Sequence, residues 1–160
     1  MMISAATAFD PERELSLTRL IEAPRASIYR CWNEPELLKQ WFAPKPFITP
    51  VAELDVRVGG SSTITMRGPD GAEYPANGVY LEVVPNRRLV STDAFTRAWE
   101  PSAKPFLTII IDLADEAGKT RYTARARHWS VEDRKEHEKM GFHEGWGICT
   151  DQLAALAARI

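Results

Sequence analysis

The chain ends in the stretch Phe142–Ile160, FHEGWGICTDQLAALAARI, and this stretch decides the fold. Large apolar side chains recur in it at steps of four and three residues, which is the spacing of one face of a helix. These side chains are Phe142, Trp146, Cys149, Leu153, Leu156 and Ile160. The opposite face carries Glu144, Asp151 and Arg159. The stretch therefore predicts a long amphipathic helix whose apolar face is covered by the rest of the chain.

Three glycines, Gly141, Gly145 and Gly147, lie at the start of this helix. Each glycine in a helix interior destabilises the helix by about 1 kcal/mol relative to alanine. A helix built only for packing would rarely hold three of them within seven residues. Because glycines keep this end of the helix thin, we expect another group to lie close to it.

Most of the chain before this helix alternates between apolar and polar residues with the period of a β-strand. The predicted strands cover residues 15–22, 47–56, 61–67, 74–84, 88–95, 106–113 and 119–129. Two short helices, 25–33 and 36–41, follow the first strand, because Pro24 and Pro35 suit the first turn of a helix. A capped helix is expected to begin at Ser130, since Asp133 follows three residues later.

These elements predict an α+β fold in which a curved antiparallel sheet of about six to seven strands wraps around the C-terminal helix. A chain of 160 residues has the size of one domain. We expect that domain to span residues 14–160 and to follow a flexible N-terminal tail, residues 1–13.

Composition excludes several classes of protein. The chain has 20 basic and 22 acidic residues, so no basic excess favours nucleic acid as a partner. No apolar run approaches the roughly 18 residues of a membrane span, and the N-terminus lacks the pattern of a signal peptide. Cys31 and Cys149 lie in apolar helical surroundings, as free thiols in a reducing cytosol do. We expect a cytoplasmic monomer or homodimer.

Several short motifs resemble one family. They are RLIEAPR at Arg19–Arg25, WNEPELL at Trp32–Leu38 followed by Trp41 and Phe42, DVRVGG at Asp55–Gly60, GPDG at Gly68–Gly71, GVYLEV at Gly78–Val83, Arg88–Val90, Met140–Phe142, and EGWG at Glu144–Gly147. Together they resemble the activator of heat-shock protein 90 ATPase homologue family of the START-like (SRPBCC) superfamily, from about Leu15 to Ala158. The resemblance implies the helix-grip fold. It also implies a deep cavity between sheet and C-terminal helix, suited to a lipid, sterol, polyketide or other apolar molecule.

His128 is the best single candidate for chemistry. Alternation along 119–129 places it on the face of Thr120, Tyr122, Ala124 and Ala126, which suits the side beneath the helix. The arginines of that strand, Arg121, Arg125 and Arg127, are then expected to face water. There His128 would hydrogen-bond a ligand or act as an acid/base near neutral pH, with Tyr80 or Asp93 as its partner. The competing interpretation is a histidine satisfied by a neighbouring backbone group or carboxylate.

Other residues are expected to line the cavity. Trp41 and Trp99 adjoin loops and could border its mouth, while Met66 would supply an adaptable wall. Asp93 falls on an apolar face and could anchor a polar head group, whereas Asp112 is assigned to solvent. The full set of candidate ligand-binding residues is Trp41, Met66, Tyr80, Asp93, Trp99, Ile109, Ile111, His128, Phe142, Trp146 and Cys149.

No metal or cofactor is expected. His137 and His143 are six residues apart, about 240° around a helix, so they cannot share a metal ion. No paired-cysteine motif or HExxH motif occurs, and Gly59–Gly60 lacks the context of a phosphate-binding loop.

Three functions remain open. The first is non-catalytic binding of a small hydrophobic or amphipathic molecule, namely a lipid, polyketide or aromatic metabolite. The second is an enzyme on the same scaffold, a cyclase, dehydratase or hydrolase that uses His128. The third is a stress-response or chaperone-associated interaction protein, which needs an exposed apolar patch.

Overall fold

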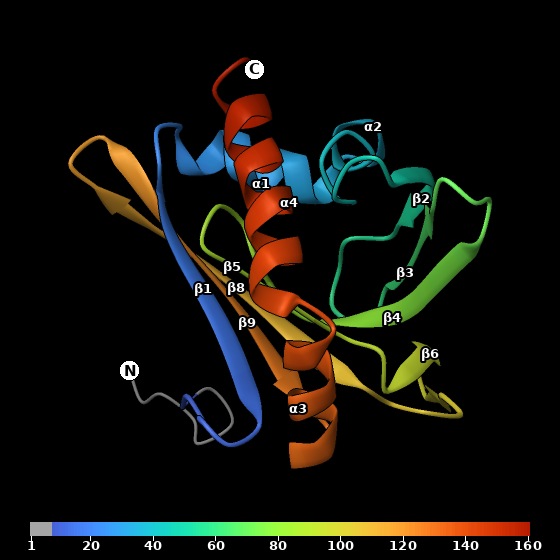
Figure 1. The fold of residues 1–160 in the computed structure, drawn as a ribbon. Coiled ribbons are helices and arrows are strands. Elements are labelled where there is room, and N and C mark those ends of the chain that lie inside the picture. Colours follow the sequence, from blue (N-terminus) through green and yellow to red (C-terminus); the bar gives the residue numbers. More distant parts are fainter. Residues whose placement is uncertain (1–7) are drawn as a thin grey trace.

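A seven-stranded antiparallel sheet forms the body of the protein, and a computed structural model describes it over residues 8–160 (Figure 1). Its strands are β1 (Glu14–Ile21), β2 (Ile48–Leu54), β3 (Ser61–Arg67), β4 (Glu73–Val84), β5 (Arg88–Thr92), β8 (Leu107–Glu116) and β9 (Lys119–His128). They are ordered β1-β9-β8-β5-β4-β3-β2 across the sheet. The first strand therefore pairs with the last, and β1 and β2 form the two edges.

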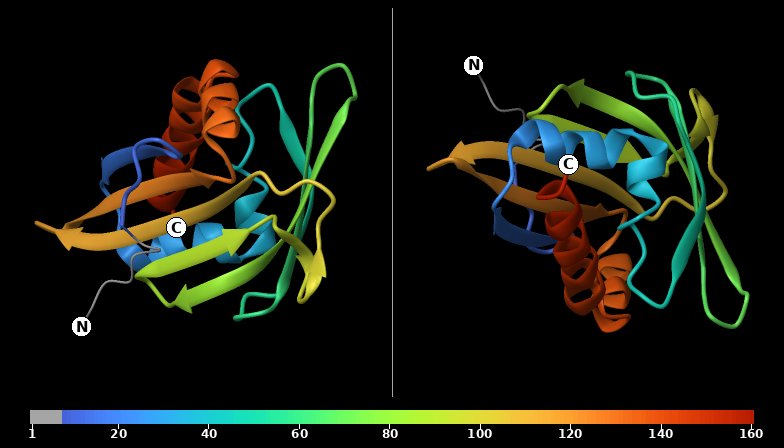
Figure 2. Two further views of the ribbon diagram at one scale, coloured as in Figure 1. Left: turned by 90° about the horizontal axis from the view of Figure 1, so that it is seen from below. Right: turned by 90° about the horizontal axis from the view of Figure 1, so that it is seen from above.

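Within residues 8–160, four helices accompany the sheet: α1 (Arg25–Asn33), α2 (Pro35–Leu38), α3 (Val131–Lys139) and α4 (Phe142–Ala157). The sheet bends strongly, and α4 lies along its concave side, with α1 crossing one end (Figure 2). Gly141, with φ +101°, lets the chain turn from α3 into α4, because the left-handed region is open to glycine at little cost. This arrangement confirms the predicted α+β helix-grip fold and its long C-terminal helix.

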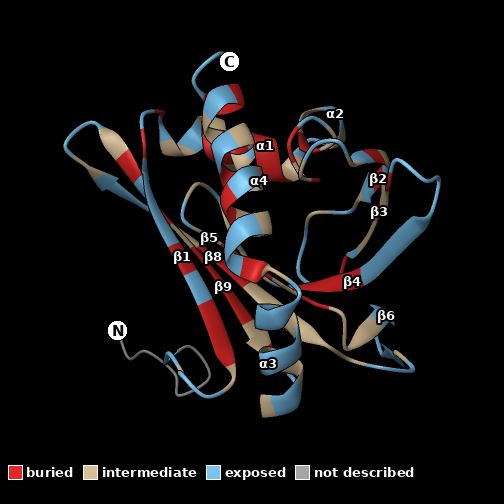
Figure 3. Ribbon diagram, in the orientation of Figure 1, coloured by how far each residue is buried: buried red, intermediate tan, exposed pale blue. Residues whose placement is uncertain are grey.

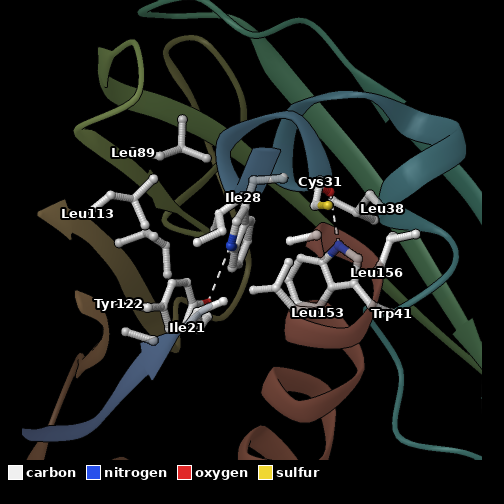
Figure 4. Close-up of a cluster of buried hydrophobic side chains, with 14 of the residues drawn as sticks. Ile21, Ile28, Cys31, Leu38, Trp41, Leu89, Leu113, Tyr122, Leu153 and Leu156 are labelled. Atoms are coloured by element: carbon white, nitrogen blue, oxygen red, sulfur yellow. Dashed lines mark hydrogen bonds between the residues drawn. The ribbon is translucent and has the colours of Figure 1, made fainter. Parts of the chain in front are cut away.

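The core lies between α4, α1 and the strands β1, β8 and β9 (Figure 3). Figure 4 shows Ile28, Tyr122 and Leu153 converging there from a helix, a strand and α4. Two indole N–H groups inside the core are paired. The Trp32 indole N–H donates to the Tyr122 hydroxyl at 3.3 Å, and the Trp41 indole N–H donates to the Cys31 carbonyl at 2.9 Å.

Some boundaries differ from the predicted ones. The strand predicted over 88–95 ends at Thr92, and the loop expected over 96–104 contains a small hairpin, β6 (Phe95–Arg97) and β7 (Glu100–Pro101). Asp93 separates the two because its carboxylate accepts the backbone N–H groups of Phe106 and Leu107. The last helix ends at Ala157 rather than Ile160.

Part of the predicted flexible tail is ordered against the domain. Met1–Thr7 lie outside the described residues, but Asp10–Arg13 form a hydrogen-bonded turn, and the backbone N–H of His128 donates to the Arg13 carbonyl at 2.8 Å. This turn extends the pairing of β1 with β9. Among residues 8–160, no helix is long and apolar enough to span a membrane.

The prediction that the β9 arginines face water is wrong for Arg125. Its guanidinium is almost fully buried and lies 2.8 Å from the carboxylate of Glu14, whose side chain is completely buried. Arg127 lies 3.8 Å from the same carboxylate. This side of the sheet is covered by the ordered residues before β1, since Phe9 lies over the Arg125 guanidinium. The alternation was correct, but the second face of β9 is also covered at Arg125, whereas Arg121 on that face is exposed.

Candidate functional site

The apolar stripe of α4 changes character along the helix. Leu153 and Leu156 are buried at the C-terminal end, and Phe142 is buried at the N-terminal end. Trp146 and Cys149, between them, remain partly exposed although they pack against the core. The middle of the stripe is thus covered incompletely by the sheet.

Apolar side chains from neighbouring elements share this partial exposure. Leu107 and Ile109 lie on the helix-facing side of β8, the side of the buried Ile111. We call five residues the apolar rim: Phe42, Leu107, Ile109, Trp146 and Cys149. Apolar surface that stays partly exposed between a sheet and a helix is suited to an apolar ligand.

Hydrogen bonds fix α4 to the segment after α2. The Gln152 amide donates to the carbonyls of Trp41 and Ala43 at 2.9 and 2.8 Å, and the Cys149 thiol donates to the Phe42 carbonyl at 3.3 Å. Burial raises the pKa of Cys149 to about 11, so its thiol stays protonated and unreactive near neutral pH. Cys149 therefore contributes packing surface and no nucleophile.

The glycines of α4 have different surroundings. A Cβ on Gly147 would lie 3.3 Å from the Arg19 guanidinium of β1, so the end of this side chain lies close to the helix at Gly147. A Cβ on Gly145 would meet nothing within 4 Å. The close approach expected from the glycines is thus made at Gly147 by β1.

The interior has little free volume. A void between α1 and the strands β5 and β8, bordered by Tyr29, Trp32 and Ile111, is too narrow for a water molecule. A second hollow, of about 330 Å³, lies on the surface beside Arg25, Asp115 and two turns. Its polar and charged lining does not suit an apolar ligand. The rim, rather than either hollow, is the apolar surface available for binding.

Two histidines meet at the N-terminal end of α4. Nε2 of His128 lies 2.8 Å from Nδ1 of His137, and Nδ1 of His128 lies 2.9 Å from the Arg13 carbonyl oxygen. A carbonyl can only accept a hydrogen bond, so Nδ1 of neutral His128 carries the proton and Nε2 presents its lone pair. Nδ1 of His137 must then donate to His128. The second nitrogen of His137, Nε2, is consequently the acceptor at the end of this chain of hydrogen bonds.

Aromatic rings surround His137. Its ring centroid lies 5.3 Å from that of Phe106, 5.2 Å from that of Phe142 and 6.1 Å from that of Trp146. Burial, and then the neighbouring His128, lower the pKa of His137 to about 4, and burial lowers the pKa of His128 as well. Both rings are therefore neutral near pH 7.

These lowered pKa values predict a specific acid sensitivity. Unfolded histidine has a pKa of about 6.5, so between pH 6.5 and 4 the unfolded chain binds more protons than the folded protein. Stability should therefore fall as the pH drops through this range, by at most about 1.4 kcal/mol per pH unit for one histidine. Urea unfolding at pH 7, 6, 5 and 4.5 should show a shallower fall for His137→Asn, which keeps a donor toward His128 but cannot titrate. An identical fall in both proteins would contradict the assignment.

A sequence model described as "Activator of Hsp90 ATPase homolog 1-like protein" matches residues 22–158. The chain belongs to this family. A solved structure from Nitrosomonas europaea is 40% identical, with a TM-score of 0.91 over 94% of this chain and 97% of that one. An AHSA1-like protein from Aeromonas hydrophila shares the fold at 18% identity, with a TM-score of 0.71 over 91% and 92% of the two chains. No curated protein matches the chain.

Within this activator-of-Hsp90-ATPase-homolog fold, two predicted site residues lie away from the rim. Trp41 was expected at the mouth of the cavity but is buried, with its ring centroid 4.9 Å from that of Trp32, so it belongs to the core. Trp99 is 88% exposed, and its ring contacts Phe95 of β6. The β6–β7 hairpin packs on β3 and β4, which places Trp99 away from α4.

Two predicted polar ligand contacts are also revised. Asp93 already accepts two backbone N–H groups, at 2.8 and 3.1 Å, so it holds the start of β8 rather than a ligand head group. Tyr80 is buried in the core, and burial raises the pKa of its hydroxyl. Neither residue contacts His128 through a hydrogen bond in the described part of the chain, so the predicted acid/base pairs do not form.

Apart from Met66, the remaining predicted residues fall in or beside the rim. Ile109, Trp146 and Cys149 belong to it, Phe142 and Ile111 form its buried floor, and Met66 is partly buried on β3. His128 is 1% exposed and lies against His137 of α3, whereas it was expected beneath the C-terminal helix, and both of its ring nitrogens are already used.

Sequence reasoning missed His137 as a partner of His128. One signal was present, since Val131 and His137 are the only residues of α3 without a formal charge at neutral pH. In residues 8–160, no group of three or more His, Cys, Asp or Glu side chains is placed to hold a metal ion.

Proposed function

We propose that the protein binds a small apolar or amphipathic molecule between its sheet and α4, without transforming it. One observation carries this proposal: the rim residues stay partly exposed where the middle of the α4 stripe meets β8 and the segment after α2. Covering them with a ligand would remove apolar surface from water, which stabilises a complex by about 25 cal/mol per Å² before the costs of association. Lipids, polyketides and aromatic metabolites have the required surface.

Binding requires side chains to move, because the interior void between α1 and the sheet does not admit even water. The side chains best suited to move are those of the rim, which are partly exposed. A ligand entering beside Trp146 would therefore displace rim side chains. The core under Leu153 and α3, whose His137 is held by His128 at 2.8 Å, would stay in place.

The first test is mass spectrometry of the gently purified protein, which should show an adduct of a few hundred daltons in the native mass that is absent after denaturation.

The second test is thermal unfolding with added apolar ligands. A ligand present at one hundred times its Kd should stabilise the fold by about 2.7 kcal/mol. Trp146→Ala should reduce this shift, whereas Ile148→Ala, on the exposed side of α4, should retain it. A bare native mass together with no thermal shift would contradict the proposal.

The second candidate function is catalysis, which the His128–His137 pair favours. His137, rather than His128, would then be the acid/base, because its Nε2 ends the hydrogen-bond chain. Turnover of a bound molecule that disappears in His137→Asn while affinity is retained would support an enzyme over a carrier.

The third candidate is an interaction protein of stress response or chaperone function. The exposed Trp99, on the β6–β7 hairpin, favours it, since a large exposed aromatic is suited to a protein contact. A partner that co-purifies with the wild type and is lost in Trp99→Ala would support this function.

A further inference from the structure

We propose that the ligand of the apolar rim is uncharged and donates a hydrogen bond, from a hydroxyl or N–H group, to Nε2 of His137. This inference rests on the proposed function and adds to it the chemical class of the ligand's polar group. The inference depends on one juxtaposition. The lone pair of His137 Nε2 is oriented by hydrogen bonds, and the imidazole ring lies beside Phe142 and Trp146 at the N-terminal end of α4.

The orientation of His137 is fixed from outside the site. The Arg13 carbonyl accepts from Nδ1 of His128 at 2.9 Å, and His128 in turn accepts from Nδ1 of His137 at 2.8 Å. Each link forces the next tautomer, so Nε2 of His137 is a lone-pair acceptor by elimination. No described residue donates a hydrogen bond to Nε2 of His137. The fully buried polar atoms without a partner do not include this nitrogen, so it keeps some exposed surface. It therefore remains accessible to a donor.

The position of His137 joins it to the rim. Trp146 belongs to the rim and also packs with Phe142 in the second apolar cluster, and both rings flank the imidazole. The centroids of the Phe142 and Trp146 rings are 4.6 Å apart. A flat apolar molecule lying on Trp146 would therefore bring an attached donor to the edge of His137.

The surrounding charges favour a neutral donor over an anion. The charged groups that influence His128 are Asp133 and Arg134 on α3 and Glu14 on β1. A carboxylate ligand would need a protonated His137, but burial and His128 lower its pKa to about 4. A carboxylate would thus face the lone pair of Nε2 and could not accept a hydrogen bond from it. A hydroxyl or N–H group would donate a hydrogen bond to the same lone pair.

Two matched probes test the inference at pH 7: 2-naphthol, which carries an O–H donor, and 2-methoxynaphthalene, which has the same rings and oxygen without it. The wild type should bind 2-naphthol about three- to tenfold more tightly, the range expected of one neutral hydrogen bond. His137→Asn keeps the donor toward His128 but offers no acceptor at Nε2, so this preference should vanish while the Kd for 2-methoxynaphthalene stays the same. Retention of the preference in His137→Asn would overturn the inference.

A second measurement uses the unaltered protein. With ¹⁵N-labelled histidine, the Nε2 resonance of His137 should lie in the unprotonated range and move toward the protonated range with 2-naphthol alone. A resonance already protonated, or unmoved by bound 2-naphthol, would overturn the inference.

The two proposals fail differently. Equal affinity of the wild type for both probes, weakened equally by Trp146→Ala, would leave rim binding intact and reject the role of His137. Binding of neither probe would reject both.

Discussion

Replacing Leu153 with alanine is expected to lower the free energy of unfolding by about 2–5 kcal/mol, because the substitution leaves a cavity in a closely packed core. Leu153 is 0% exposed and belongs to the main cluster, where α4 meets α1 and the sheet (Figure 4). Its side chain is surrounded by elements from both ends of the chain. The cavity left by the substitution therefore cannot be filled by the movement of a single loop. Urea unfolding followed by circular dichroism measures the change.

Ile148→Ala is the matched control, since it removes an aliphatic side chain of the same size from the same helix. Ile148 is 38% exposed and lies outside the core clusters, so the expected loss is well under that of Leu153→Ala. Equal losses in the two variants would mean that α4 is held by its helical propensity rather than by its buried stripe.

Replacing Glu14 with alanine is expected to cost about 3–5 kcal/mol, because it leaves a buried guanidinium without its carboxylate. The Glu14 carboxylate lies 2.8 Å from Nη2 of Arg125 and also accepts the backbone N–H of Asp10 at 2.6 Å. The change thus weakens both the β1–β9 pairing and the turn before β1. Thermal unfolding at constant pH should show the loss.

Glu73→Ala supplies the control for Glu14. Glu73 pairs with Arg67 at 2.7 Å, also between neighbouring strands, but both side chains are about half-exposed. Water screens such a pair, so its removal should change stability by about 0–1 kcal/mol. If Glu73→Ala and Glu14→Ala were equally destabilising, burial of the Glu14 pair would not be the cause.

The sequence predicted the parts of the fold that follow from periodicity. The stripe of α4 and the alternation of β9 each depend on neighbours within a few residues, so the buried positions of Leu153 and His128 could be inferred locally. The family motifs then agreed with this order of elements and implied the helix-grip fold.

What could not be predicted depends on contacts between distant residues. Glu14 and Arg125 are 111 residues apart, so nothing near Arg125 indicated that its face would be covered. Trp41 and Trp99 both adjoin loops, yet one points into the core and the other into solvent, which local pattern does not distinguish. The partnership of His137 with His128 depends on how α3 lies against β9, and this is set by packing rather than by spacing.

The pairing of β1 with β9 has a consequence for how the chain reaches its native state. Leu15 lies opposite Ala126, so the first strand to leave the ribosome has to wait for the last one before it gains a neighbour. Until then β1 is an unpaired strand, and such strands are prone to associate with other chains. Closing so long a loop also slows folding, as in other topologies dominated by non-local pairing. Synthesis and folding of this domain are therefore expected to be successive events, with the sheet completed only after β9 has been made.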